Sequence, residues 1–106
     1  MKYAIDFPAT PVLPVVESSE VFPVGRIYCV GRNYADHARE MGHDPAREPP
    51  FFFMKPANAI VQNGATIRYP VATKDLHHEI ELVIALGKGG ADIPVEKALD
   101  HVWGYG

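Results

Sequence analysis

Short apolar runs, separated at close intervals by proline and glycine, dominate the hydrophobic pattern of the first 90 residues. Prolines divide residues 1–23 into pieces too short for a helix, and each proline favours extended backbone in the residue before it. We therefore expect residues 1–23 to form an extended edge or covering segment, with a domain boundary near Pro23. The β-branched and aromatic run at 26–30 then predicts a buried strand, which Gly31 ends.

The next segment changes to a helical pattern. Residues 35–41 suit a helix of two turns with Gly42 as its C-terminal stop. The polar, proline-containing stretch 43–50 predicts a connection of the kind that often closes over a site as a lid.

Two further apolar patterns predict strands in the middle of the chain. Residues 51–54 are all apolar, and Lys55 stands at the exit of this predicted strand. The short runs 60–61 and 67–69 flank the turn dipeptide Asn63-Gly64, which predicts a hairpin.

The C-terminal third predicts one long strand and one helix. In residues 79–87 both alternating faces become apolar after the first few positions, as in a strand buried on both sides. Residues 94–103 have a proline in the first turn, apolar residues at helical spacing and Gly104 as a stop. The pattern as a whole predicts a mixed α/β, β-rich fold.

Composition narrows the classes of protein. The 106 residues suit one domain, and 10 basic against 13 acidic side chains give a net charge of −3, which argues against nucleic-acid or anionic-membrane surfaces. No apolar run approaches the roughly 20 residues that a bilayer requires. The single cysteine, Cys29, cannot form an internal disulfide, and its apolar surroundings predict an inert buried thiol in a cytoplasmic protein.

Glu79 and Glu81 are the first candidate site residues. Alternate positions of a strand share a face about 6.6 Å apart, so the two carboxylates can converge on one hard cation such as Mg²⁺, Mn²⁺ or Ca²⁺. The alternative is an exposed acidic face of an edge strand. Of the adjacent histidines, His77 shares the Glu79 face and His78 the opposite one, so at most one of them supports the site, with His77 favoured; otherwise both are surface residues.

His37 and Glu40 form the second candidate group. At spacing i, i+3 on a helix, Glu40 can orient the His37 imidazole for activation of water, although such pairs are also common as solvated ion pairs. Arg32 and Lys55 can bind substrate carboxylates, or they are ordinary surface charges.

Taken together, four motifs in order resemble the fumarylacetoacetate hydrolase family, and most closely its bacterial fumarylpyruvate hydrolase and acylpyruvase branch. The motifs occupy residues 27–37, 51–56, 78–82 and 98–105. The resemblance implies a β-roll, a homodimer, and a divalent metal held by Glu79, Glu81 and an aspartate expected shortly after Gly106. It also implies that residues 24–106 are the N-terminal portion of the family's catalytic domain, within a longer natural protein.

The reaction implied by the resemblance is hydrolysis of a carbon–carbon bond in a 2,4-diketo acid, with release of pyruvate, during degradation of aromatic compounds. His37 with Glu40 would activate water, the metal would stabilise the departing enolate, and Arg32 and Lys55 would hold substrate oxygens. Three alternatives remain open: oxaloacetate decarboxylation on the same scaffold, a ring-opening, decarboxylating or hydratase relative from the same pathways, and a non-catalytic metal-binding or assembly module.

Overall fold

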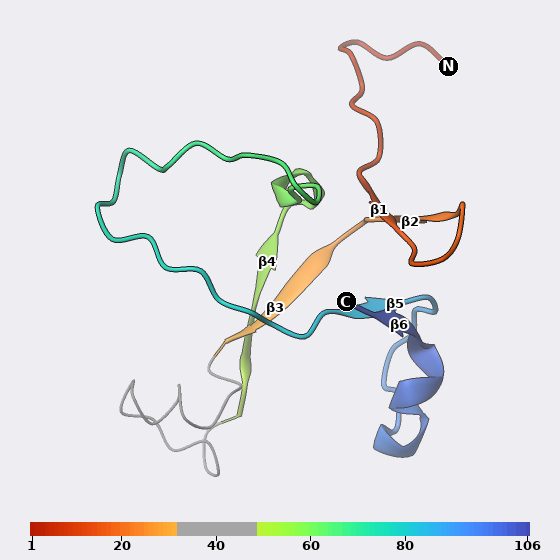
Figure 1. Cartoon of the computed structure of the whole chain (residues 1–106). Helices are drawn as coiled ribbons and strands as arrows, with labels where there is room; N and C mark the ends of the chain where they lie inside the picture. The colour runs from red at the N-terminus through yellow and green to blue at the C-terminus, as the bar shows by residue number, and fades with distance from the viewer. Residues whose placement is uncertain (32–48) are drawn as a thin grey trace. The chain divides into compact units, whose positions relative to one another are not determined.

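The computed structural model describes residues 1–31 and 49–106 of the chain (Figure 1). The predicted helix at 35–41 and nearly all of the predicted lid at 43–50 lie outside the described residues. Two compact units divide the chain, Met1–Ile67 and Arg68–Gly106. Their strands form three antiparallel pairs, β1 with β2, β3 with β4, and β5 with β6. The predicted subdivision at Pro23 stays a prediction.

The first pair lies within the predicted covering segment. Strands β1 (Val12–Pro14) and β2 (Val21–Pro23) place Leu13 opposite Phe22. Just beyond β2, the Val24 N–H donates to the Pro11 carbonyl at 2.8 Å. The prolines at the strand ends leave few backbone donors for a longer ladder, so the pair stays at three residues per strand.

The second pair confirms two predicted strands. Strand β3 (Ile27–Gly31) runs antiparallel to β4 (Phe51–Lys55) over five residue pairs, from Ile27 opposite Lys55 to Gly31 opposite Phe51. The expected burial of β3 is only partly found, because Gly31 is buried, Cys29 is half-buried, and the intervening side chains are exposed. The one-turn 3₁₀ helix η1 (Ala57–Ala59) follows β4.

The predicted hairpin at 60–69 is wrong, although its turn is present. Gly64 has a φ of 76°, and the Ala65 N–H donates to the Gln62 carbonyl at 3.1 Å. The flanking runs are too short to stabilise a ladder without further packing. Instead, the Gln62 amide nitrogen donates to the Val12 carbonyl in the β1 strand at 2.7 Å.

The predicted strand at 79–87 is shorter than expected. Strand β5 covers only Ile84–Leu86 and pairs with β6 (Val102–Tyr105), with an irregular register between Ala85 and Leu86. Val83 and Gly106 exchange two backbone hydrogen bonds of 2.8 and 2.9 Å next to this ladder. β5 is therefore regular only over the residues that pair with β6, because hydrogen-bonded pairing, and not the apolar pattern, sets the length of a strand.

The helix predicted at 94–103 is found in part, over fewer residues and as a 3₁₀ helix. A 3₁₀ helix, η2 (Val95–His101), leads directly into β6. The last apolar positions of the helical pattern, Val102 and Trp103, belong to the strand instead, where branched and aromatic residues are favoured. Among the residues that the structure describes, no helix combines the length and apolar character needed to span a membrane.

Very little apolar surface is covered within this chain. Val24, 8% exposed, is the only buried hydrophobic side chain in the described ranges. The prediction that residues 79–87 are buried on both faces is wrong for this chain: Ile80 is 91% exposed.

Gly31 offers a test of the β3–β4 packing. A Cβ at this position would overlap the ring of Phe51, the residue directly opposite, whereas a Cβ at Gly25 would meet nothing within 4 Å. We expect Gly31→Val to destabilise the pair by about 1–3 kcal/mol through overpacking. Amide hydrogen exchange of residues 27–31 should then accelerate by about 5- to 150-fold. Gly25→Val is the matched control, and equal acceleration in both variants would contradict this account.

Candidate active site

The structure describes three of the six predicted site residues. Lys55 lies in the first unit, and Glu79 and Glu81 lie in the second. Arg32, His37 and Glu40 lie outside the described residues.

Glu79 and Glu81 lie just before β5, in a segment without regular secondary structure. Both side chains are exposed, and neither has a hydrogen-bond or ion-pair partner among the described residues. Their carboxylate oxygens are therefore available to an incoming ligand. Residues 1–31 and 49–106 contain no group of three or more His, Cys, Asp or Glu side chains that could hold a metal ion. The acidic pair alone would supply two ligands.

That donor set fits a hard divalent cation in part. Mg²⁺ and Mn²⁺ favour oxygen ligands, and Mg²⁺ commonly binds through one or two carboxylates together with water and substrate oxygens. Two exposed carboxylates at alternate positions match this preference. The remaining coordination positions would fall to other groups, to water or to a chelating substrate.

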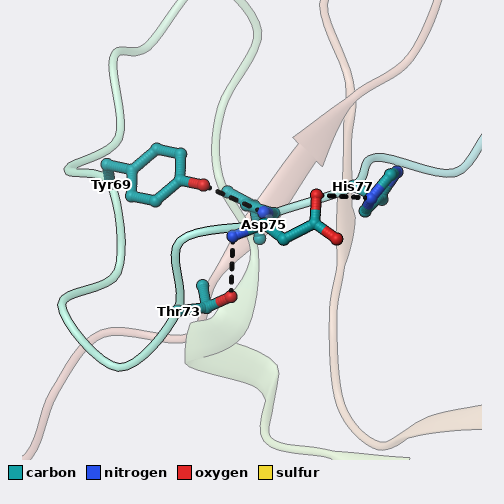
Figure 2. Close-up of polar contacts among 5 residues, drawn as sticks. Tyr69, Thr73, Asp75 and His77 are labelled. Carbon is teal, nitrogen blue, oxygen red and sulfur yellow. Dashed lines mark hydrogen bonds and ion pairs between the residues drawn. The ribbon is translucent and has the colours of Figure 1, made fainter.

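A set of polar contacts folds the loop that leads to the acidic pair (Figure 2). The Leu76 N–H donates to the Tyr69 hydroxyl at 2.9 Å, and the Asp75 N–H donates to Thr73 Oγ1 at 3.1 Å. His77 Nε2 lies 2.8 Å from Asp75 Oδ1. These three contacts close the chain between residues 69 and 77, two positions before Glu79.

The partner of His77 is the feature that sequence reasoning missed. Asp75 was not among the predicted residues, although its position two residues before the histidine was a usable signal. The two side chains are 76% and 87% exposed, so water weakens their attraction to about 0–1 kcal/mol. The contact can orient the ring of His77, and it adds little to stability.

Lys55 is the last residue of β4 and lies at the end of the β3–β4 ladder that is farther from Gly31. It faces Ile27, the first residue of β3, whereas the chain leaves β3 through Gly31, four residues later. At about 3.3 Å per residue, the two ends of this ladder are roughly 13 Å apart. Lys55 and Gly31 therefore lie at opposite ends of the β3–β4 ladder.

Comparisons with known proteins identify relatives of this chain. The family model described as fumarylacetoacetate (FAA) hydrolase C-terminal matches residues 26–106. The chain is 47% identical over 81 residues to the mitochondrial oxaloacetate decarboxylase of Dictyostelium discoideum. It is 44% identical over 80 residues to the mitochondrial oxaloacetate tautomerase of Arabidopsis thaliana. Each alignment covers 76% of this chain, but only 37% and 35%, respectively, of the relative.

A solved structure is more similar still. The fumarylpyruvate hydrolase of Pseudomonas aeruginosa, in complex with Mn²⁺ and pyruvate, is 56% identical and superposes with a TM-score of 0.88. The match covers 98% of this chain and 46% of the solved one. The chain thus spans about a third of the curated relatives and just under half of this enzyme.

The Tyr69 contact gives a test of how the loop before the acidic pair is held. Tyr69→Phe removes the acceptor of the Leu76 N–H, at a cost of about 0.5–1.5 kcal/mol. Exchange of the Leu76 amide should accelerate by about 2- to 12-fold, as measured by NMR. Tyr105→Phe in β6 is the control, since the described contacts give its hydroxyl no partner. An unchanged Leu76 amide in Tyr69→Phe would show that the bond does not hold the loop.

Proposed function

Because the chain belongs to the fumarylacetoacetate hydrolase family, we propose that it forms part of a metal-dependent hydrolase that cleaves a 2,4-diketo acid such as fumarylpyruvate and releases pyruvate. One observation carries the proposal. The matched enzyme from Pseudomonas aeruginosa, 56% identical over 98% of this chain, holds Mn²⁺ and pyruvate. The exposed carboxylates of Glu79 and Glu81 provide oxygen ligands of the kind such a cation prefers.

In this proposal, Glu79 and Glu81 hold the cation, which is Mn²⁺ or Mg²⁺, with Ca²⁺ as a further oxygen-preferring candidate. When bound, the cation supplies positive charge that stabilises the negative oxygens of a 2-oxo acid. Arg32 and Lys55 bind carboxylate or carbonyl oxygens of the substrate.

We assign the hydrolytic step to His37 and Glu40. Glu40 orients the imidazole, and His37 takes a proton from water, so that hydroxide adds to the distal carbonyl carbon. The bond between that carbon and the neighbouring methylene carbon breaks, and its electron pair leaves with the pyruvate enolate. The proton on His37 then returns to the enolate carbon, which gives pyruvate and a carboxylic acid.

Oxaloacetate decarboxylation is the second candidate. The relative from Dictyostelium discoideum, 47% identical over 81 residues, is an oxaloacetate decarboxylase. Loss of CO₂ from oxaloacetate also produces pyruvate enolate, but it consumes no water. The two reactions therefore need the same cation and differ in their need for a base that activates water.

Three finer features belong to the proposal as well. We propose that the substrate comes from degradation of aromatic compounds, that the working enzyme is a homodimer, and that it is cytoplasmic. The family resemblance supports the first two.

The role of His37 is tested in a chimera that joins this chain to the remaining part of the Pseudomonas aeruginosa enzyme. With saturating Mn²⁺, we expect pyruvate release from fumarylpyruvate, which coupled reduction of pyruvate measures. His37→Ala should lower hydrolysis by about 10²- to 10⁴-fold, the usual contribution of a positioned base. Decarboxylation of oxaloacetate should change much less.

His101→Gln is the control, because glutamine can keep a hydrogen bond to the Lys88 carbonyl that His101 Nδ1 contacts at 3.0 Å. Absence of pyruvate release from every acylpyruvate tested would refute the hydrolase proposal. Equal loss of both reactions in His37→Ala would refute the assignment of water activation.

The metal ligands are tested separately from turnover. In the same chimera, Glu79→Gln and Glu81→Gln should each weaken Mn²⁺ binding on the order of 10- to 100-fold, because a neutral amide replaces a charged ligand. The electron paramagnetic resonance signal of free Mn²⁺ measures this affinity. Glu96→Gln in the first turn of η2 is the matched control. Unchanged affinity in both test variants would remove the acidic pair from the metal site.

A further inference from the structure

Asn63 and Gly64 lie at the centre of an exposed turn that no strand pairing holds. They form the only Asn-Gly dipeptide in the sequence. The φ of 76° at Gly64 suits the third position of a type II turn, which the hydrogen bond from the Ala65 N–H to the Gln62 carbonyl closes. Residues 60–69, all of them described, form no ladder. One hydrogen bond, worth about 0.5–1.5 kcal/mol, therefore resists rotation of the backbone at Asn63.

The backbone nitrogen of Gly64 is open to reaction with the side chain that precedes it. Its N–H has no hydrogen-bond partner among the described residues, and a Cβ at Gly64 would meet nothing within 4 Å beyond its chain neighbours. The Asn63 side chain is exposed and has no partner in the same part of the chain. Asparagine is a thermolabile residue, and a following glycine, which lacks a Cβ, hinders attack on it least.

We propose that Asn63 is a site of spontaneous deamidation, and that its isoaspartyl product releases a contact between this turn and β1. The Gly64 nitrogen gives its proton to water or hydroxide and bonds to Asn63 Cγ, while the Cγ–Nδ2 bond breaks and the amide leaves as ammonia. Water then opens the cyclic imide. Addition at Cγ gives aspartate, and addition at the backbone carbonyl carbon gives isoaspartate. Water is the only co-reactant, and no atom is oxidised or reduced.

The contact that the modification releases joins this turn to the first strand pair. The Gln62 amide nitrogen donates to the Val12 carbonyl at 2.7 Å. Pro23, opposite Val12 in the ladder, has no N–H to offer this carbonyl. Isoaspartate at position 63 lengthens the main chain by one carbon and adds a carboxylate directly after Gln62. The turn then no longer closes onto the Gln62 carbonyl, and the Gln62 side chain loses the backbone position from which it reaches β1.

Asn58 provides a matched comparison in the same short stretch. It is exposed like Asn63, but it lies in η1, where the Ala59 N–H donates to the Pro56 carbonyl at 3.0 Å and the Ile60 N–H to the Ala57 carbonyl at 3.4 Å. The nitrogen that would attack Asn58 is thus already engaged, and it carries a residue with a Cβ. One additional hydrogen bond slows a reaction by about 2- to 12-fold, and the Cβ slows it further.

Peptide mass spectrometry of the chimera, after incubation in mildly alkaline buffer, tests the site. Residues 48–68 form one tryptic peptide with both asparagines, because trypsin does not cut before Pro56. We expect Asn63 to deamidate on the order of tenfold faster than Asn58. Electron-transfer fragmentation, which distinguishes the two products, should show isoaspartate at position 63. Asn63→Gln should remove the reaction at this position, since the longer side chain closes a less favourable ring.

The effect on the Gln62 contact is measured by NMR in the same chimera. In the isoaspartyl form, exchange of the Gln62 side-chain amide protons with water should accelerate by about 2- to 12-fold, the loss of one hydrogen bond. Asn63→Asp is the matched control. It introduces the same carboxylate without lengthening the main chain, so its Gln62 amide should exchange as in the unmodified protein.

Three results would overturn the proposal. One is equal deamidation of Asn58 and Asn63. Another is an isoaspartyl form in which the Gln62 amide exchanges as slowly as in the unmodified protein. The third is equal acceleration in Asn63→Asp, which would assign the effect to charge and not to the longer main chain. None of these measurements uses pyruvate release, so they are independent of whether the proposed hydrolase activity is correct.

Discussion

The five-residue ladder between β3 and β4 is the constraint on which the proposed site depends. It fixes Gly31 opposite Phe51, and so brings together the points where the chain enters and leaves residues 32–50. Arg32, His37 and Glu40 all belong to that stretch. The ladder thus offsets the conformational entropy that closing a long intervening segment costs, a cost that grows only slowly with the length of that segment.

The β3–β4 ladder alone does not make its sheet stable. Two strands alone are marginal in water, and stable sheets need a third strand or a packed layer. In this chain the β3–β4 residues are mostly exposed, and Val24 is the only buried hydrophobic side chain in the part of the chain that the structure describes. The four apolar residues of β4, Phe51 to Met54, thus exceed what pairing with β3 alone covers.

The strands that were predicted correctly are those whose ends are marked by nearby residues in the sequence. Gly31 ends β3, and Lys55 with Pro56 ends β4, so both strands were predicted within a residue of their observed limits. The predicted bounds of the elements at 79–87 and 94–103 differ from the observed ones for another reason. Their apolar patterns are real, but pairing of β5 with β6, distant in sequence, decides where regular structure begins.

The candidate site likewise has some features that the local sequence shows and others that only the folded structure creates. The spacing of Glu79 and Glu81 and the order of the motifs are visible in sequence, and the family assignment follows from them. The contact between Asp75 and His77 has a weaker signal, the spacing of two residues, because exposed polar contacts in a loop follow no periodic pattern. Which groups complete the coordination of a cation depends on residues brought together by the fold, and local spacing carries no information about them.

Covering the chain and binding a cation should reinforce one another at the acidic pair. Like charges separated by about 6.6 Å, the spacing that a strand would give this pair, repel by about 0.6 kcal/mol in water, but by about 2.5 kcal/mol at an effective dielectric constant of 20. Both are exposed in this chain, so their repulsion is small. If water is excluded from such a pair, the repulsion grows and only a positive charge offsets it. By linkage, a cation held at Glu79 and Glu81 then stabilises the covered state, and the covered state binds the cation more tightly.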